Sequence, residues 1–146
     1  MTDTTPSPAA ELQRTWALAA ADADAAMDLF YTTLFEMAPE VRPLFSGIPM
    51  PDQKKKLAAA INLVVKSPEL PPSVTGALRD LGQRHVGYGV EDAHYDAVGA
   101  ALIETLATAL GSEFTPAARA AWTGAYGSVA GHMKAGAAGT QAIAAE

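Results

Sequence analysis

The feature that most constrains this chain is a series of amphipathic helical segments separated by prolines and glycines. Apolar residues recur at three- and four-residue spacing, the period of an α-helix with one buried face. Leu57, Ile61 and Val65, for example, follow one another at four-residue intervals. Alanine is abundant and β-branched residues are few, which favours helix over strand. We therefore expect an all-α domain of roughly six to eight helices and no strand.

Capping residues and prolines predict where these helices begin and end. Ser7-Pro8 and Thr115-Pro116 each pair a capping side chain with a proline in the first turn. The segment 39–45 is bounded by prolines, so it fits one turn of 3₁₀- or α-helix at a corner. Other helices are predicted to start at Asp22 or Asp24, at Pro51-Asp52, at a Ser73 cap and at Glu91-Asp92, the last of them closing at Gly111.

The predicted organisation is a flexible leader at residues 1–7, one folded domain at residues 8–134 and an Ala/Gly-rich tail at residues 135–146. The last helix is expected to end in this tail after Gly136. A proline-bounded corner with a pocket between the middle helices is typical of a globin-type fold and differs from an up-down four-helix bundle.

Composition excludes several classes of function. Ten Lys and Arg against sixteen Asp and Glu give a net charge of −6, which argues against a nucleic-acid partner. The chain of 146 residues has no cysteine, so it has no disulfide, thiolate nucleophile or cysteine-based metal site. It shows neither a signal-peptide pattern nor an apolar run approaching the ~20 residues that span a bilayer. We expect a cytoplasmic protein without a membrane partner.

His85 is the residue whose type and position point most specifically to a chemical role. Leu78, Leu81 and His85 share one helical face, and glycines at 87 and 89 then end the helix. A neutral imidazole that points into apolar space is a suitable axial ligand for an iron porphyrin. The alternative is a histidine that simply fills the core, so His85 by itself does not decide between them.

Several segments, in order and at compatible spacing, make the chain resemble the globins. Residues 30–35 (FYTTLF) and 38–45 (APEVRPLF) resemble the second helix and corner of neuroglobin-like and bacterial single-domain globins. Residues 82–86 (GQRHV) match the segment on the proximal side of the haem. Residues 91–99 (EDAHYDAVG) and 121–130 (AWTGAYGSVA) resemble the globin domain of flavohaemoglobins. The resemblance covers residues 8–134.

This resemblance implies a cofactor, haem b, and a set of residues around it. His85 would be the proximal ligand of the iron, and Phe45 would pack on the porphyrin face. Tyr31 and Gln53 would lie on the distal side with Leu57 over the haem. The alternatives are a core tyrosine for Tyr31 and a solvated first-turn residue for Gln53.

The remaining implied contacts form the walls and mouth of the pocket. Lys56 and Arg84 would pair with the haem propionates, although a solvated run at residues 54–56 explains Lys56 equally well. His94 and His132 have no evident ligand partner and are interpreted as surface or core residues. The residues implied for the walls are Met50, Ile61, Leu81, Val90, Tyr95 and Val98.

The proximal side departs from the flavohaemoglobin pattern at one position. In that family a tyrosine and a glutamate flank the proximal histidine and push electron density toward the iron. This chain keeps the tyrosine as Tyr95 but has Ala137 where the glutamate is expected. It also lacks a reductase domain within its 146 residues, so a redox cycle would need a separate reductase.

The leading functional expectation is a haem globin that reversibly binds oxygen, and also NO and CO, as an oxygen-transport protein. Dioxygen gains negative charge when it binds iron, and the Tyr31 hydroxyl and Gln53 amide are neutral donors that would stabilise it. High oxygen affinity is therefore expected. The alternatives are a nitric oxide dioxygenase that detoxifies NO with an external reductase, and a globin-type gas sensor. We expect a monomer or weak homodimer.

Overall fold

The computed structural model describes the backbone of residues 7–45, 47–67, 69–87 and 92–145, and their side chains except at 85–87, 92 and 137–145. Within these ranges the chain is helical and contains no strand, as the sequence predicts. No helix there is both long and apolar enough to cross a membrane. The elements are α1 (Pro8–Ala20), α2 (Ala23–Met37), η1 (Pro39–Phe45), α3 (Met50–Lys66), α4 (Pro72–Gly87), α5 (Asp92–Leu110), η2 (Gly111–Glu113) and α6 (Pro116–Ala145).

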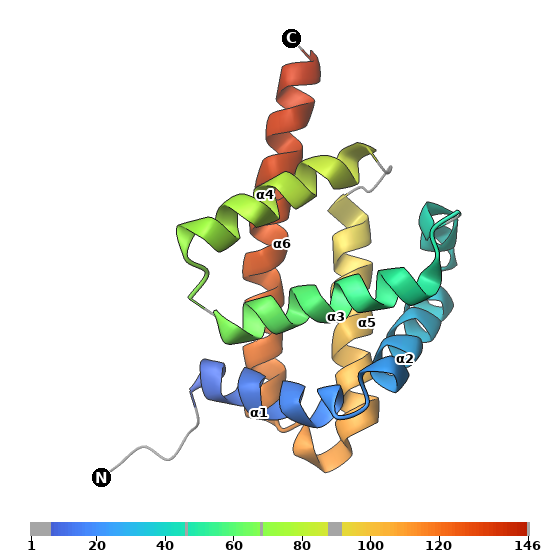
Figure 1. The fold of residues 1–146 in the computed structure, drawn as a ribbon, viewed down its shortest axis with the longest axis vertical. Coiled ribbons are helices and arrows are strands. Elements are labelled where there is room, and N and C mark those ends of the chain that lie inside the picture. Colours follow the sequence, from blue (N-terminus) through green and yellow to red (C-terminus); the bar gives the residue numbers. More distant parts are fainter. Residues whose placement is uncertain (1–6, 46, 68, 88–91, 146) are drawn as a thin grey trace.

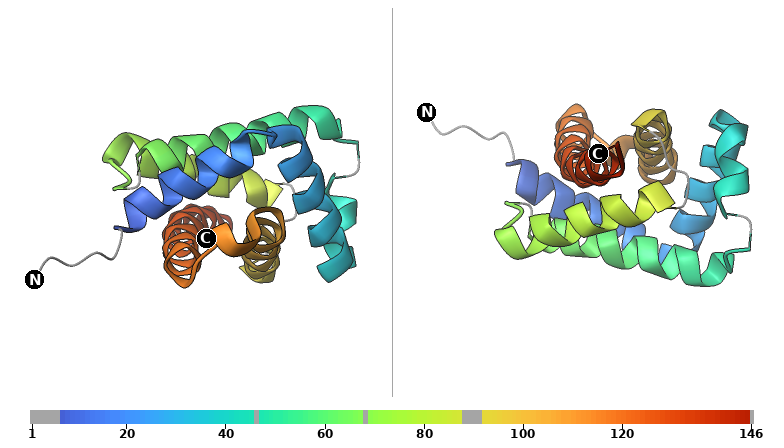
Figure 2. Two further views of the ribbon diagram at one scale, coloured as in Figure 1. Left: turned by 90° about the horizontal axis from the view of Figure 1, so that it is seen from below. Right: turned by 90° about the horizontal axis from the view of Figure 1, so that it is seen from above.

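The helices form two layers that cross at a steep angle. α5 and α6 run side by side along the length of the molecule, and α1, α3 and α4 lie across them (Figure 1). The end-on views show the same two layers, with α2 closing one side (Figure 2). α4 packs chiefly on α6, whereas α2 packs on α5. As a result, the middle of the molecule is surrounded by α2, α3, α4 and α5.

Side-chain caps fix the helix starts where the sequence predicts them. The Ser7 side chain accepts a hydrogen bond from the Ala10 amide at 3.1 Å. Asp22 caps α2 through the Ala25 amide at 3.2 Å, and Thr115 caps α6 through the Ala118 amide. Each cap satisfies an amide that has no partner inside the first turn.

Two predicted boundaries differ from the structure. Ser73 is not a cap, because α4 already begins at Pro72, and the amides of Val74 and Thr75 bond to the Pro71 carbonyl. Proline suits the first helical position because its missing N–H would have had no partner there. The last helix also does not end after Gly136 but continues to Ala145. High alanine content favours this longer helix.

The buried residues form two clusters that meet near α5. The main cluster joins α1, α2, α3, α5 and α6, and it includes a buried hydrogen bond of 2.7 Å from the Trp122 indole to the Thr15 hydroxyl. The second cluster lies under α4 and consists of Val74, Leu78, Tyr95, Ala130 and Met133. α4 is thus attached to the molecule through its own small cluster.

Two glycines let α4 and α6 approach to backbone contact. A Cβ atom on Gly82 would overlap the backbone carbonyl of Met133, and one on Gly136 would overlap the carbonyl of Arg79. Because backbone is present on the other side in both cases, no side-chain rotation could relieve the overlap. The crossing therefore requires glycine at both positions.

We predict that Gly82→Ala destabilises the protein by about 1–3 kcal/mol, since α4 must move away from α6. Gly76 is the matched control, because it lies in the same helix and its Cβ position is open. Gly76→Ala should stabilise the protein by about 0.5–1 kcal/mol through helix propensity alone. Urea unfolding followed by circular dichroism measures both. Equal effects from the two variants would contradict the close crossing.

Candidate functional site

Tyr31 lies at the centre of an aromatic cluster between α2 and the corner η1. Its side chain is 4% exposed. The Phe45 ring meets the Tyr31 ring edge-on at 5.5 Å between centroids, and Phe35 contacts both rings. Phe30 packs edge-on against the other side at 4.9 Å. The corner thus holds the phenol ring in one place, because each neighbouring ring restricts its rotation.

Gln53 joins Tyr31 across the interface between α2 and α3. It lies in the first turn of α3, half-buried, and its side chain is close enough to the Tyr31 phenol to influence its pKa. Burial raises the pKa of Tyr31 above 10, and the Gln53 side chain opposes this only in part. Tyr31 therefore stays protonated at neutral pH and keeps a proton to donate.

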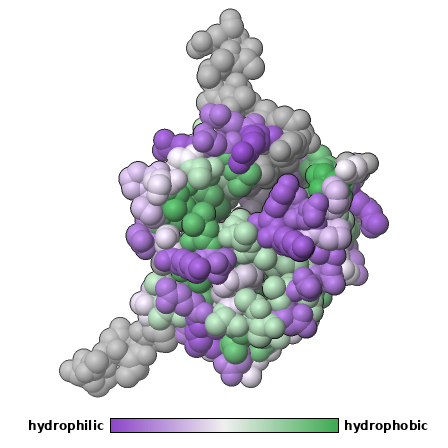
Figure 3. Space-filling view, in the orientation of Figure 1, coloured by the Kyte–Doolittle hydropathy of each residue, from purple (hydrophilic) through white to green (hydrophobic). Residues whose placement is uncertain are grey.

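The residues expected around this pair pack against the main cluster. Ile61 is buried on α3, and the half-buried members are Phe45, Met50, Leu57 and Val98. The space-filling view is hollowed between α3 and α4, with hydrophobic side chains along one wall and hydrophilic side chains along the other (Figure 3). The distal residues implied by the resemblance are thus gathered in and against the main cluster, where α2 packs on α3 and α5.

The proximal residues implied by the resemblance lie on the face of α4 that carries Leu78 and Leu81. Leu78 is buried in the second cluster and Leu81 packs against it. His85 follows Leu81 by four residues in the same helix, so it continues that face by one turn. The His85 side chain and Val90 lie outside the described residues, and their roles stay predictions.

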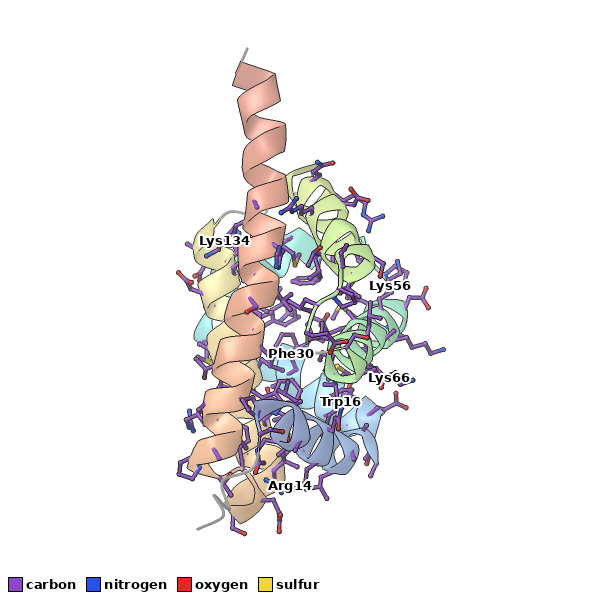
Figure 4. The ribbon with its side chains drawn as sticks, turned by 90° about the vertical axis from the view of Figure 1, so that its left-hand side faces the viewer. Arg14, Trp16, Phe30, Lys56, Lys66 and Lys134 are labelled. Carbon is purple, nitrogen blue, oxygen red and sulfur yellow. The ribbon has the colours of Figure 1, made fainter. Side chains whose placement is uncertain are left out.

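The two cations expected at the mouth lie on the surface. Arg84 is exposed at the end of α4, and Lys56 is exposed on the outer side of α3 (Figure 4). The neighbouring Lys54 forms an ion pair with Asp28 of α2, directly beside the Tyr31–Gln53 pair. In the sequence, Lys54 belongs to the run at residues 54–56 for which solvation is one interpretation, and no partner for it is expected there. The one signal for the ion pair is that Lys54 follows Gln53 directly and Asp28 lies one turn before Tyr31.

Asp28 and Lys54 also line an open cleft of about 630 Å³ that reaches Tyr31. Phe35 and Met50 form its apolar part, and the Arg42 guanidinium lies over the Phe35 ring at 5.3 Å. Tyr31 therefore borders an open cleft formed by residues of α2, η1 and α3.

The surroundings of Tyr95 are the second feature that sequence reasoning missed. The Tyr126 hydroxyl donates to the Tyr95 backbone carbonyl at 2.5 Å, and the Tyr126 ring rests on Gly99, where a Cβ would lie 2.7 Å from it. Burial raises the pKa of Tyr126 well above its ordinary value. The Lys134 ammonium lies over the Tyr95 ring. Tyr95 is thus fixed by α6 from two directions.

A crossed two-layer helical fold, with a 3₁₀ corner and a buried tyrosine beside a half-buried glutamine, is typical of globin-like proteins. The family model described as Globin matches residues 28–133. The chain belongs to the globin family.

Three known proteins show the range of its relatives. It is 30% identical to an anaerobic nitrite reductase of Oryza sativa subsp. indica over 83% of this chain and 87% of the relative. It is 30% identical to a flavohemoprotein of Rhizobium meliloti (strain 1021) over 69% of this chain, but spans only 26% of that protein. An engineered carbene transferase from Rhodothermus marinus, whose name also describes a nitric oxide dioxygenase, is 25% identical with a TM-score of 0.83 and full coverage of both chains.

The raised pKa of Tyr31 predicts a loss of stability in alkali. Below the unfolded-state pKa of about 10 the phenol is protonated in both states, so its contribution is complete. As the pH rises from there through the folded pKa, the unfolded state ionises first and the free energy of unfolding falls. Tyr31→Phe should flatten this decline.

Urea unfolding at a series of pH values from 8 to 12 measures the slope. Tyr126→Phe should flatten it as well, since burial raises that pKa too. An unchanged slope in Tyr31→Phe would contradict the burial of a protonated phenol at this position.

Proposed function

We propose that this globin binds haem b between α3 and α4 and reversibly binds oxygen and other diatomic gases there. His85 on α4 would be the axial ligand, and Tyr31 and Gln53 would lie across from it. The observation that carries the proposal is the proximity of Gln53 to the buried Tyr31, two residues 22 positions apart that the fold brings together at the interface of α2 and α3. Membership of the globin family supports it independently.

The residues around the proposed site fit a haem in their chemistry. Ile61 belongs to the main cluster, Leu57 packs on it and Leu81 packs on the second cluster, so apolar side chains would border a haem between α3 and α4. Haem would supply a ferrous iron to which a diatomic gas can bind. The apolar borders would exclude water from that iron, and Lys56 and Arg84 would meet the propionates at the surface.

Tyr31 and Gln53 would act on the gas by donating hydrogen bonds. The protonated Tyr31 phenol and the Gln53 amide are neutral donors in a site of low polarity, where each bond is electrostatically stronger than in water. Dioxygen accepts negative charge on binding and CO accepts little, so the two donors would favour dioxygen. Phe45 holds the Tyr31 ring, so the donor needs little reorganisation to meet the gas.

The first test is haem binding itself. Purified protein mixed with hemin should show a Soret band, and the reduced protein should bind CO with a shifted spectrum. A protein that stays colourless after hemin is added would overturn the proposal.

The second test is oxygen release. The double variant Tyr31→Phe, Gln53→Leu should release oxygen at least tenfold faster, since each lost hydrogen bond contributes about 1 kcal/mol. Stopped-flow mixing of the oxygenated protein with CO measures the rate. Tyr126→Phe removes an equivalent hydroxyl away from the distal side and should leave it unchanged. An unchanged rate in the double variant would mean that neither residue contacts the gas.

A second candidate function is nitric oxide dioxygenase, supported by the Rhodothermus marinus structure that matches the whole chain. Oxygenated protein would convert NO to nitrate, and a separate reductase would return the iron to the ferrous state. Steady nitrate production with NADH and an added flavohaemoglobin reductase domain tests this. A single turnover that does not repeat would favour the binding function. Incubation without oxygen but with nitrite, NADH and the same reductase domain, followed by the release of NO, tests the activity in the rice relative's name.

The remaining parts of the proposal are a cytoplasmic location and a monomer or weak homodimer. The net charge of −6 supports solubility in the cytoplasm. Sedimentation of the purified protein measures the oligomeric state.

A further inference from the structure

Lys134 places a positive charge directly against Tyr95. Its ammonium nitrogen lies 5.6 Å from the centre of the Tyr95 ring and 3.9 Å from a carboxylate oxygen of Asp96. The Lys134 side chain is half-buried, while the Asp96 carboxylate is 85% exposed. The Lys134 ammonium therefore lies against the aromatic ring and is partly shielded from water, whereas water screens the charge of the Asp96 carboxylate.

This charge lies close to the part of α4 that leads to His85. Met133, which precedes Lys134, contacts the backbone of Gly82, and Gly82 is three residues before His85. Tyr95 belongs to the same cluster as Leu78, whose helical face His85 continues. In the side-chain view Lys134 points from α6 toward α5, away from the lysines of α3 (Figure 4). The α4–α6 crossing and Tyr95 thus hold Lys134 beside the proximal wall.

We propose that Lys134 raises the reduction potential of the haem iron through its charge and so favours the ferrous state. The proposal rests on haem binding at His85. Ferric haem carries one more positive charge than ferrous haem, so a nearby cation disfavours the ferric state. Flavohaemoglobins are expected to have a carboxylate on this side of the haem, and this chain has Ala137 at that position and Lys134 one turn earlier.

A series of substitutions at one position separates this charge effect from packing. The midpoint potential of the haem-loaded protein, measured by spectroelectrochemistry, should fall from wild type to Lys134→Met and fall further in Lys134→Glu. Lys134→Arg should keep the wild-type value. Asp96→Asn removes the partly screened anion and should raise the potential. A packing role for Lys134 would not order the variants by charge.

The expected size is about a threefold to tenfold change in the ferrous-to-ferric ratio at a fixed potential for Lys134→Met. A tenfold change corresponds to 59 mV for one electron. Lys66→Met is the control, since it makes the same charge change at an exposed site at the end of α3 (Figure 4). That control should leave the potential within the error of the measurement.

The outcomes distinguish this inference from the proposed function. A protein that does not take up hemin overturns both, and the Soret titration detects this before any potential is measured. Haem binding with equal potentials in wild type, Lys134→Met and Lys134→Glu overturns the role of Lys134 alone. Should Lys134→Met fail to fold, two other variants still test the role of the charge. The midpoint potential should stay unchanged in Lys134→Arg and rise in Asp96→Asn.

Discussion

The backbone contact between α4 and α6 is the constraint on which the rest of the site depends. α4 carries His85, yet it has few partners other than α6 and the small cluster beneath it. Gly82 and Gly136 set how closely the two helices approach. Any side chain at either position would push α4 away from α6 and so displace the helix that carries His85. The position of the proposed proximal ligand is therefore set by glycine packing on α6.

The proposed site lies between two packing units rather than within one. Tyr31 and Leu57 belong to or pack on the main cluster, whereas Leu81 and Tyr95 belong to or pack on the second. A flat apolar cofactor between the clusters would contact both and link α4 to the main body of the protein. We therefore expect haem binding and the stability of α4 to be thermodynamically coupled.

The fold could be predicted from the sequence wherever local chemistry decides the structure. Ser7, Asp22 and Thr115 cap helices as expected, since capping involves residues within one turn. The errors arose where one residue had two possible roles. Ser73 could cap a helix, but Pro72 already starts it. Gly136 could end a helix, but the packing of α6 on α4 requires glycine there, and the helix continues.

The resemblance placed Tyr31 and Gln53 on one side of the proposed site, and the structure brings them close together, while their role toward a bound gas stays a prediction. The ion pair of Lys54 with Asp28 and the contact of Lys134 with Tyr95 could not be predicted, because each joins different helices and no local spacing encodes them. Sequence reasoning noted that the proximal carboxylate was replaced by Ala137. It could not show that a cation lies nearby, because this depends on how α6 is rotated against α5.

The two sides of the proposed site would therefore act in the same direction by different physical means. On the distal side, neutral donors would stabilise negative charge on a bound gas without adding net charge to the pocket. On the proximal side, Lys134 would add a positive charge that disfavours the ferric state. A proximal carboxylate would do the opposite. A cation on that side would favour the ferrous iron to which oxygen binds, and a dioxygenase would need the same ferrous iron at the start of each turnover.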